Sequence, residues 1–316
     1  MRSTAAIPAA DTTEPWARLP RYQRSREEHC PDVAALGAQI VPFAEAESAI
    51  NQSALSAGAR ALLRGLLRVG TTRVFPGGGL GIEYGSLLKT AARPEYVAAH
   101  VAEAAAHLLD RRVDLLLVPG MSGYPIGAMY SLVAGIPAIL LKKGSLAAIE
   151  RFPDPAYPTG AFVIPSYTGD GDVVMHADPP AVADIISGIV ASQLAAQADL
   201  PAAHITLRAA GADDIIDKAT MSHAVGESAV AIGHAAIAET IRRHRLATAD
   251  PRPITCEVAV VAWVTPLIKG YNHPEAVLRR HFDLTPFAGL NVIGLSLDPA
   301  AIAVAGVSGV LAFATP

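Results

Sequence analysis

The hydrophobic residues follow two patterns along the chain, one typical of amphipathic helices and one typical of buried strands. Residues 94–109 place apolar side chains every three or four positions, which predicts a helix that begins at Pro94. Short apolar runs at 114–119 and 137–141 are bounded by glycine, proline or lysine, as buried parallel strands are. The same criteria predict further helices at 33–69, 128–134, 182–196, 221–245 and 274–282, and further strands at 161–166, 172–176, 204–208, 257–263 and 290–297.

Strands and helices alternate in this order, which predicts an α/β fold with a doubly wound parallel sheet. We divide the chain into an N-terminal arm at 1–32, the first half of the α/β core at 33–178, and a C-terminal half at 179–316 that completes the sheet. The C-terminal half is enlarged, and we expect an insertion around 179–255. The apolar stretch 300–316 is expected in the core or at an interface.

The segment 115–141 carries no charged residue and is long enough to cross a bilayer, which takes about 20 helical residues. It also contains Pro119, Gly120 and Pro125, which interrupt helices. The segment therefore favours strands and loops of a soluble core, and we expect no membrane partner. No apolar signal segment is recognised near the N-terminus, so a cytoplasmic location is expected.

Composition narrows the possible classes further. Hydrophobic residues make up 51% of the chain and charged residues only 17%, which excludes a disordered chain. A net charge of −4 lacks the basic surface that nucleic-acid binding requires, so no nucleic-acid partner is expected. The two cysteines, Cys30 and Cys256, are too few for a disulfide framework and indicate a reducing compartment.

The strongest chemical signal is a glycine-rich turn between the strand at 114–119 and the following helix. Backbone N–H groups in such a turn point toward an anion, and Ser122 adds a hydroxyl donor. The next strand ends at Lys142 and Lys143, at the carboxyl edge where open α/β sheets bind ligands. The pattern predicts a phosphate or pyrophosphate site. In the alternative interpretation, the glycines serve turns and packing, and Lys142 and Lys143 are solvated residues at the end of a strand.

Several motifs resemble the adenine branch of the type I phosphoribosyltransferases. Phe75-Pro76, followed by residues 81–88 and Pro94-Glu95, is similar to the segment that precedes the family's first sheet strand. Residues 114–143 are similar to its strand–loop–helix–strand, and residues 167–178 to its hairpin. The matches occur in the family's order, which makes them more specific than any one motif.

The resemblance implies a phosphoribosyltransferase fold with a helical N-terminal region and a hood loop. Val74 and Phe75 would then contact a base, and residues 145–160 would form a flexible closing loop. Mg²⁺ as cofactor, a homodimer, and a phosphoribosyl or nucleotide-like ligand are likewise implied, whereas no residue is assigned as a metal ligand. The implied phosphate-binding residues are Gly120, Met121, Ser122, Gly123, Tyr124, Lys142 and Lys143.

The family's acidic hallmark, two acids before a Thr-Gly-Gly-Thr turn, is degenerate in this chain. One candidate, 212–221, keeps paired acids in Asp213 and Asp214; the other, 258–270, keeps the strand and turn without the acids. We prefer the first, because such acids would hold ribose hydroxyls and stabilise an oxocarbenium-like centre. Asp213, Asp214 and Lys143 are therefore the catalytic candidates, although acids at a helix N-terminus also favour the helix dipole.

Three functions follow as hypotheses. The first is a phosphoribosyltransferase-like enzyme that transfers or cleaves a phosphoribosyl group at a Mg²⁺–pyrophosphate or phosphate site. The second is a repurposed fold that binds a nucleotide or phosphate ligand or catalyses another reaction, and the third is a hydrolase that uses Ser122. His223 and His234, about 16 Å apart on one predicted helix, are too distant to share a metal, and each is expected to be structural.

Overall fold

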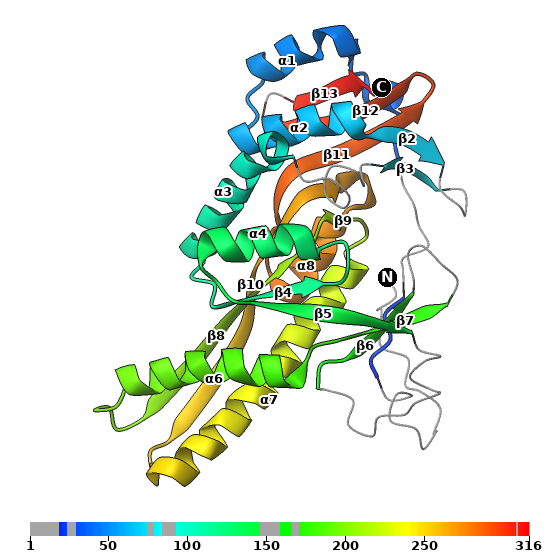
Figure 1. Cartoon of the computed structure of the whole chain (residues 1–316). Coiled ribbons are helices and arrows are strands. Elements are labelled where there is room, and N and C mark those ends of the chain that lie inside the picture. The colour runs from blue at the N-terminus through cyan, green and yellow to red at the C-terminus, as the bar shows by residue number, and fades with distance from the viewer. Residues whose placement is uncertain are drawn as a thin grey trace.

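The computed structural model describes residues 19–23, 30–74, 79–83, 93–145, 159–165, 171–307 and 309–315. In these ranges the chain forms one large sheet of eleven strands with helices on both faces, and a separate two-stranded sheet (Figure 1). The fold is a layered α/β architecture, and the predicted fold class is confirmed.

Helices and strands alternate along the described parts of the chain. The helices are α1 (Ala46–Gln52), α2 (Ala57–Val69), α3 (Pro94–Asp110), α4 (Tyr124–Ala134), α6 (Pro179–Ala196), α7 (Thr220–Thr248) and α8 (Pro274–Phe282). The short 3-10 helices are Val33–Leu36, Phe43–Glu45 and Gly270–Asn272. The strands are β1 (Ile40–Val41), β2 (Thr71–Val74), β3 (Leu80–Glu83), β4 (Leu115–Pro119), β5 (Ala138–Ser145), β6 (Phe162–Pro165), β7 (Asp172–His176), β8 (Ala203–Ala212), β9 (Ile215–Ile216), β10 (Ile254–Lys269), β11 (Phe287–Leu297), β12 (Ala300–Gly306) and β13 (Gly309–Ala314).

Five parallel strands form the centre of the large sheet, in the spatial order β11-β10-β8-β4-β5. Numbered by their order in the chain, these strands run 5-4-3-1-2, which is the doubly wound order of flavodoxin-like proteins. The order reverses between β4 and β8, where Leu117 pairs with Gly211. In sheets of this order, ligands bind beyond the carboxyl ends of the strands at that reversal. The topology therefore singles out the ends of β4 and β8.

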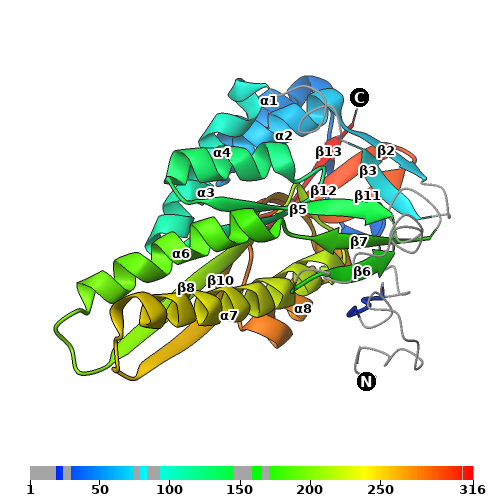
Figure 2. The ribbon, with the colours of Figure 1, turned by 60° about the horizontal axis from the view of Figure 1, so that its bottom comes forward.

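Two helical layers cover the central strands (Figure 2). On one face, α3 and α4 bury side chains such as Leu108 and Ile126 against β4, β8 and β10. On the other face, α6 and α7 bury Ile186 and Ile232 against the same strands. A third apolar cluster joins α2 to β11, β12 and β13. Apolar clusters therefore pack against both faces of β4 and β8, next to the reversal point.

Local sequence explains where the helices next to this edge begin and end. The Ser56 hydroxyl accepts a hydrogen bond from the Ala59 N–H at 3.0 Å and caps α2. In α4, proline occupies the first turn, where its missing N–H has no helical partner in any case. The same helix ends at Gly135, whose φ of 68° lies in the left-handed region that glycine adopts readily.

Several sequence-based boundaries need correction. Helix α4 begins at Tyr124 rather than at 128, because Pro125 initiates the helix directly after the turn. The pairing of β2 (Thr71–Val74) with β3 (Leu80–Glu83) was not predicted. The stretch 300–316, expected in the core or at an interface, contains β12 and β13 of the large sheet, and these strands bury side chains in the core. The segment 179–255 is not an insertion, since it contains β8, which lies between β4 and β10 in the middle of the sheet.

The described part of the N-terminal arm is attached to the core. The Tyr22 N–H donates to the Val163 carbonyl of β6 at 3.0 Å, and Arg21 forms an ion pair with Asp172 at 3.0 Å. Tyr22 also contacts the ring of Phe162 edge-on, with the ring centroids 5.8 Å apart. Residues 19–23 thus pack along β6 and β7.

One described helix, α6, has the length and mean hydropathy (1.2) of a membrane span. Its side chains Val182, Ile186, Val190 and Leu194 are buried in the core cluster that contains α7 and the sheet. A single helix of this kind is weak evidence for a span, because core helices meet the same criteria. The run 115–141 is not one helix: it forms β4, a turn, α4 and the first half of β5.

Candidate functional site

The turn that follows β4 lies open at the carboxyl edge of the sheet. Met121 is 71% exposed and Ser122 is partly exposed, while Gly123 is buried at the start of α4. The peptide bond between Gly120 and Met121 is cis. The Gly120 N–H and the Tyr124 hydroxyl both donate to the Leu141 carbonyl, at 3.0 and 2.6 Å. The turn is therefore fixed to β5 while its outer face remains accessible.

The paired acids lie directly beside this turn. Asp213 follows the last residue of β8, and a β-carbon added to Gly123 would stand 2.8 Å from the Asp213 Oδ1 atom. Only glycine fits this approach without movement, because the Pro119 carbonyl oxygen would be 2.9 Å away on another side. The Asp213 Oδ1 atom accepts the Asp214 N–H at 2.9 Å. Turn and acids thus meet at the reversal point between β4 and β8.

A row of buried polar groups continues beneath the acids. Asp214 is 2% exposed. Burial raises the pKa of Tyr130 well above its ordinary value, and the charge of Asp214 raises it further. The Tyr130 hydroxyl lies 2.6 Å from His100 Nε2, and burial lowers the pKa of His100 to about 4. Tyr130 and His100 were not predicted as neighbours, since nothing in their spacing on α4 and α3 indicates that they meet.

The two lysines at the end of β5 do not have equivalent positions. Lys142 forms an ion pair with Asp178 at 2.8 Å. Burial raises the pKa of the Tyr124 hydroxyl, and the positive charge of Lys142 opposes that rise. Successive residues of a strand point to opposite faces, so Lys143 lies on the other face of β5. Lys142 is the cation beside the turn, and it already has a carboxylate partner.

The two candidate versions of the acidic hallmark lie side by side. Asp217, from the first candidate, pairs with Lys269, from the end of the second, at 3.2 Å. The Asn272 amide donates to the other Asp217 oxygen at 2.5 Å. Ala219, with φ of 55°, occupies the left-handed region just before α7 begins at Thr220. Residues 212–221 and 258–270 therefore contribute together to the same edge of the sheet, so they are not alternative locations for the acidic motif.

The remaining predicted site residues are only partly described. Val74 ends β2 and is 54% exposed, whereas Phe75 and most of the predicted closing loop at 145–160 lie outside the described residues. Within the ranges that the structure describes, Ser122 has no histidine as a hydrogen-bond partner, and histidine is the general base that most often activates a serine nucleophile. The geometry gives the hydrolase hypothesis no support.

Neither a protein-family model nor a curated protein matches the chain. The solved structures with a similar fold are phosphoribosyltransferases, and the sequence motifs resemble the same class.

The individual structures are adenine phosphoribosyltransferases. For the enzyme of Thermoanaerobacter pseudethanolicus the identity is 12% and the TM-score 0.43, over 72% of this chain and 97% of that one. For the Giardia lamblia enzyme complexed with 9-deazaadenine the identity is 11% and the TM-score 0.43, over 73% and 96% of the chains. For the Rhodothermus marinus enzyme the values are 15% and 0.39, over 73% and 98%. These are similarities of fold, and no residue role is taken from them.

Proposed function

We propose that the chain is an enzyme that transfers or cleaves a phosphoribosyl group at the carboxyl edge of its sheet. The observation that carries this proposal is the close approach of the Asp213 carboxylate to Gly123, which brings the glycine turn and a carboxylate together at the topological reversal point. An anion and a polyhydroxylated sugar are the two parts of a phosphoribosyl donor. The juxtaposed turn and acids supply one binding element for each part.

The chemistry follows from the two elements. N–H groups of residues 121–123 and the Ser122 hydroxyl would hold phosphate or pyrophosphate oxygens, as backbone amides at a helix N-terminus do, whereas the Gly120 N–H already donates to the Leu141 carbonyl. Asp213 and Asp214 would accept hydrogen bonds from ribose hydroxyls and stabilise positive charge at the anomeric carbon. The carboxylate oxygens also fit Mg²⁺, which would neutralise the charge of the pyrophosphate.

A repurposed phosphoribosyltransferase fold is the alternative, and specific residues favour it. Asp217, Lys218 and Ala219 stand where the family has a threonine and glycine turn, and Lys142 is paired with Asp178. A fold altered in this way would bind a nucleotide or another phosphate ligand without phosphoribosyl transfer, or would catalyse a different reaction. The two proposals differ in turnover, not in the location of the site.

Calorimetric titration tests the site itself. We expect the purified chain with Mg²⁺ to bind both pyrophosphate and phosphoribosyl pyrophosphate. Asp213→Asn is expected to weaken binding of phosphoribosyl pyrophosphate at least tenfold, and more than that of pyrophosphate, because only the former presents ribose hydroxyls. Asp110→Asn is the matched control: this exposed residue ends α3, which leads to the amino end of β4, at the opposite edge of the sheet. Absence of heat with both ligands at millimolar concentration would remove the proposal.

Turnover separates the enzyme from the binder. The chain is incubated with phosphoribosyl pyrophosphate and Mg²⁺, with and without a panel of nucleobases, and released pyrophosphate is measured. Release that Asp214→Asn abolishes supports the enzyme. Binding without release of pyrophosphate under all conditions supports the repurposed fold.

A further inference from the structure

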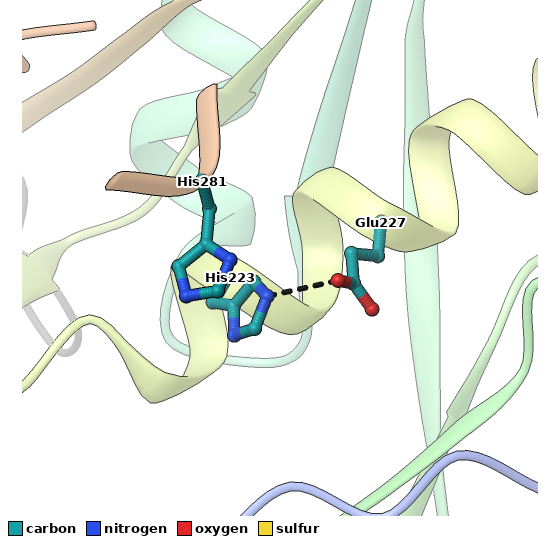
Figure 3. Close-up of side chains that lie close together, drawn as sticks. All are labelled: His223, Glu227 and His281. Carbon is teal, nitrogen blue, oxygen red and sulfur yellow. Dashed lines mark hydrogen bonds and ion pairs between the residues drawn. The ribbon is translucent and has the colours of Figure 1, made fainter. Parts of the chain in front are cut away.

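We propose that His223, Glu227 and His281 form a binding site for a divalent transition-metal ion of the Zn²⁺ type. Each of the three side chains offers one ligand atom, and these atoms all lie within 4.8 Å of one another (Figure 3). The site uses nitrogen donors and does not include Asp213 or Asp214. The proposal is therefore independent of the phosphoribosyl chemistry proposed above.

The backbone brings the three residues together in a defined way. His223 and Glu227 are four residues apart on α7, so they share one face of the helix, and the His223 Nε2 atom lies 2.9 Å from the Glu227 Oε1 atom. His281 comes from the last turn of α8. Gly226 allows the two helices to meet, because a β-carbon there would stand 2.2 Å from the ring of Phe282. The close approach thus places His281 beside His223.

The two imidazole rings lie face to face. The His223 and His281 rings are stacked with centroids 3.6 Å apart. One nitrogen of each ring and one Glu227 oxygen lie within 4.8 Å of one another. The stacked rings therefore offer two nitrogen donors to one ion beside the carboxylate.

Glu227 is held in place by a further residue, as metal-binding carboxylates commonly are. The Tyr22 hydroxyl donates a short hydrogen bond to the Glu227 Oε2 atom, which leaves Oε1 directed at His223. The Tyr22 ring also lies edge-on to the His223 ring, with centroids 5.3 Å apart. The N-terminal segment thus orients two of the three ligands.

The donor set selects the kind of metal. Two imidazole nitrogens and one carboxylate oxygen suit Zn²⁺ and its neighbours, whereas Mg²⁺ prefers oxygen donors throughout. Donor atoms on one tetrahedral Zn²⁺ are about 3.3 Å apart, so binding draws the three ligands slightly closer. His281 is exposed at the end of α8 and is able to rotate toward the ion. Three protein ligands leave the fourth position to water or another ligand.

Metal titration of the tag-free full chain tests the site. After treatment with a chelator, the chain is titrated with Zn²⁺ by calorimetry and with Co²⁺ by visible absorption. We expect one Zn²⁺ per chain and a Co²⁺ spectrum typical of four-coordinate geometry, both unaffected by excess Mg²⁺. His281→Ala and Glu227→Gln, both at exposed positions, are expected to weaken Zn²⁺ binding at least a hundredfold.

The control is a histidine–carboxylate pair elsewhere on the chain. His204 lies 3.9 Å from Glu257 on the exposed end of β8 and β10, and among the described residues no third ligand joins them. His204→Ala should leave Zn²⁺ affinity and stoichiometry unchanged. Absence of Zn²⁺ binding by the unaltered chain, or equal binding by the His281→Ala chain, would overturn the proposal. Circular dichroism of the metal-free variants checks that each remains folded.

Discussion

His100 shows how strongly a single buried position can depend on protonation. Its side chain is completely buried, its ring is stacked on Phe287, and its Nε2 atom lies 2.6 Å from the Tyr130 hydroxyl. Burial lowers its pKa to about 4, from an ordinary value of 6.5. Between these two values the unfolded chain takes up a proton that the folded chain does not. Above pH 6.5 His100 is neutral in both the folded and the unfolded chain, so its burial does not lower the free energy of unfolding there.

We expect the free energy of unfolding to decrease as the pH falls from 6.5 to 4. The contribution of His100 to this decrease is on the order of 3 kcal/mol, at about 1.4 kcal/mol for each unit by which the pKa is lowered. Urea unfolding at several pH values measures it. His100→Gln retains a hydrogen-bonding group for Tyr130 but does not titrate, so the decrease should be shallower. If the free energy of unfolding fell equally with pH in the two proteins, the protonation of His100 would not be the cause of the decrease.

The candidate site was only partly predictable at the level of residues. The turn 120–124 and the acids Asp213 and Asp214 carry local signals, because a glycine turn and a pair of acids each indicate chemistry without knowledge of the fold. The group of His223 and His281 carries no such signal, since its members come from helices separated by β10. Spacing along one helix excluded a metal shared by His223 and His234, but it gave no information on ligands from another helix.

Among the elements, the contact between β8 and β10 is unusually close. A β-carbon on Gly211 would stand 2.0 Å from the buried ring of Trp263 on the neighbouring strand. The tryptophan ring lies over the backbone of β8, where any side chain would collide with it. The absence of a side chain at Gly211 is therefore a requirement of the packing.

We expect Gly211→Ala to reduce the free energy of unfolding by about 3 kcal/mol or more, because neither the strand nor the buried ring has room to move. Chemical denaturation measures the change. Gly188→Ala is the matched control, since a β-carbon at this position of α6 meets no atom within 4 Å. In that helix alanine is expected to stabilise by about 0.5–1 kcal/mol. If both substitutions changed stability equally, the close packing at Gly211 would be refuted.

The order of elements followed from the sequence, but several of their limits did not. Apolar runs indicated β4 and β5 because buried parallel strands are continuous in hydrophobicity. β10 is much longer than the predicted 257–263. It begins at Ile254, beside exposed residues such as Thr255, and it continues through the buried residues 264–269, where Thr265 and Pro266 interrupt the apolar run. The ends of β10 are set by its pairing with β8 and β11, and a local sequence pattern carries no information about that pairing.

At the scale of the whole molecule, the last strand holds the first one in the sheet. β13 lies between β12 and β1, and its Phe313 is completely buried in the cluster that α2 and β11 also form. Phe313→Ala is expected to cost about 3–5 kcal/mol, as a cavity would remain in that cluster. Val310→Ala on the same strand, at a 39% exposed position, should cost less than about 1 kcal/mol. Urea denaturation distinguishes the two, and equal costs would place Phe313 outside the core.

The position of β13 has a consequence for biosynthesis. β1 pairs in parallel with β13 and has no other strand beside it among the described residues. Until the ribosome has synthesised residues 309–314, β1 lacks the neighbour that completes its hydrogen bonding. Closure of that side of the sheet therefore waits for β13, and a nascent chain stalled before β13 would expose the apolar surface that chaperones recognise.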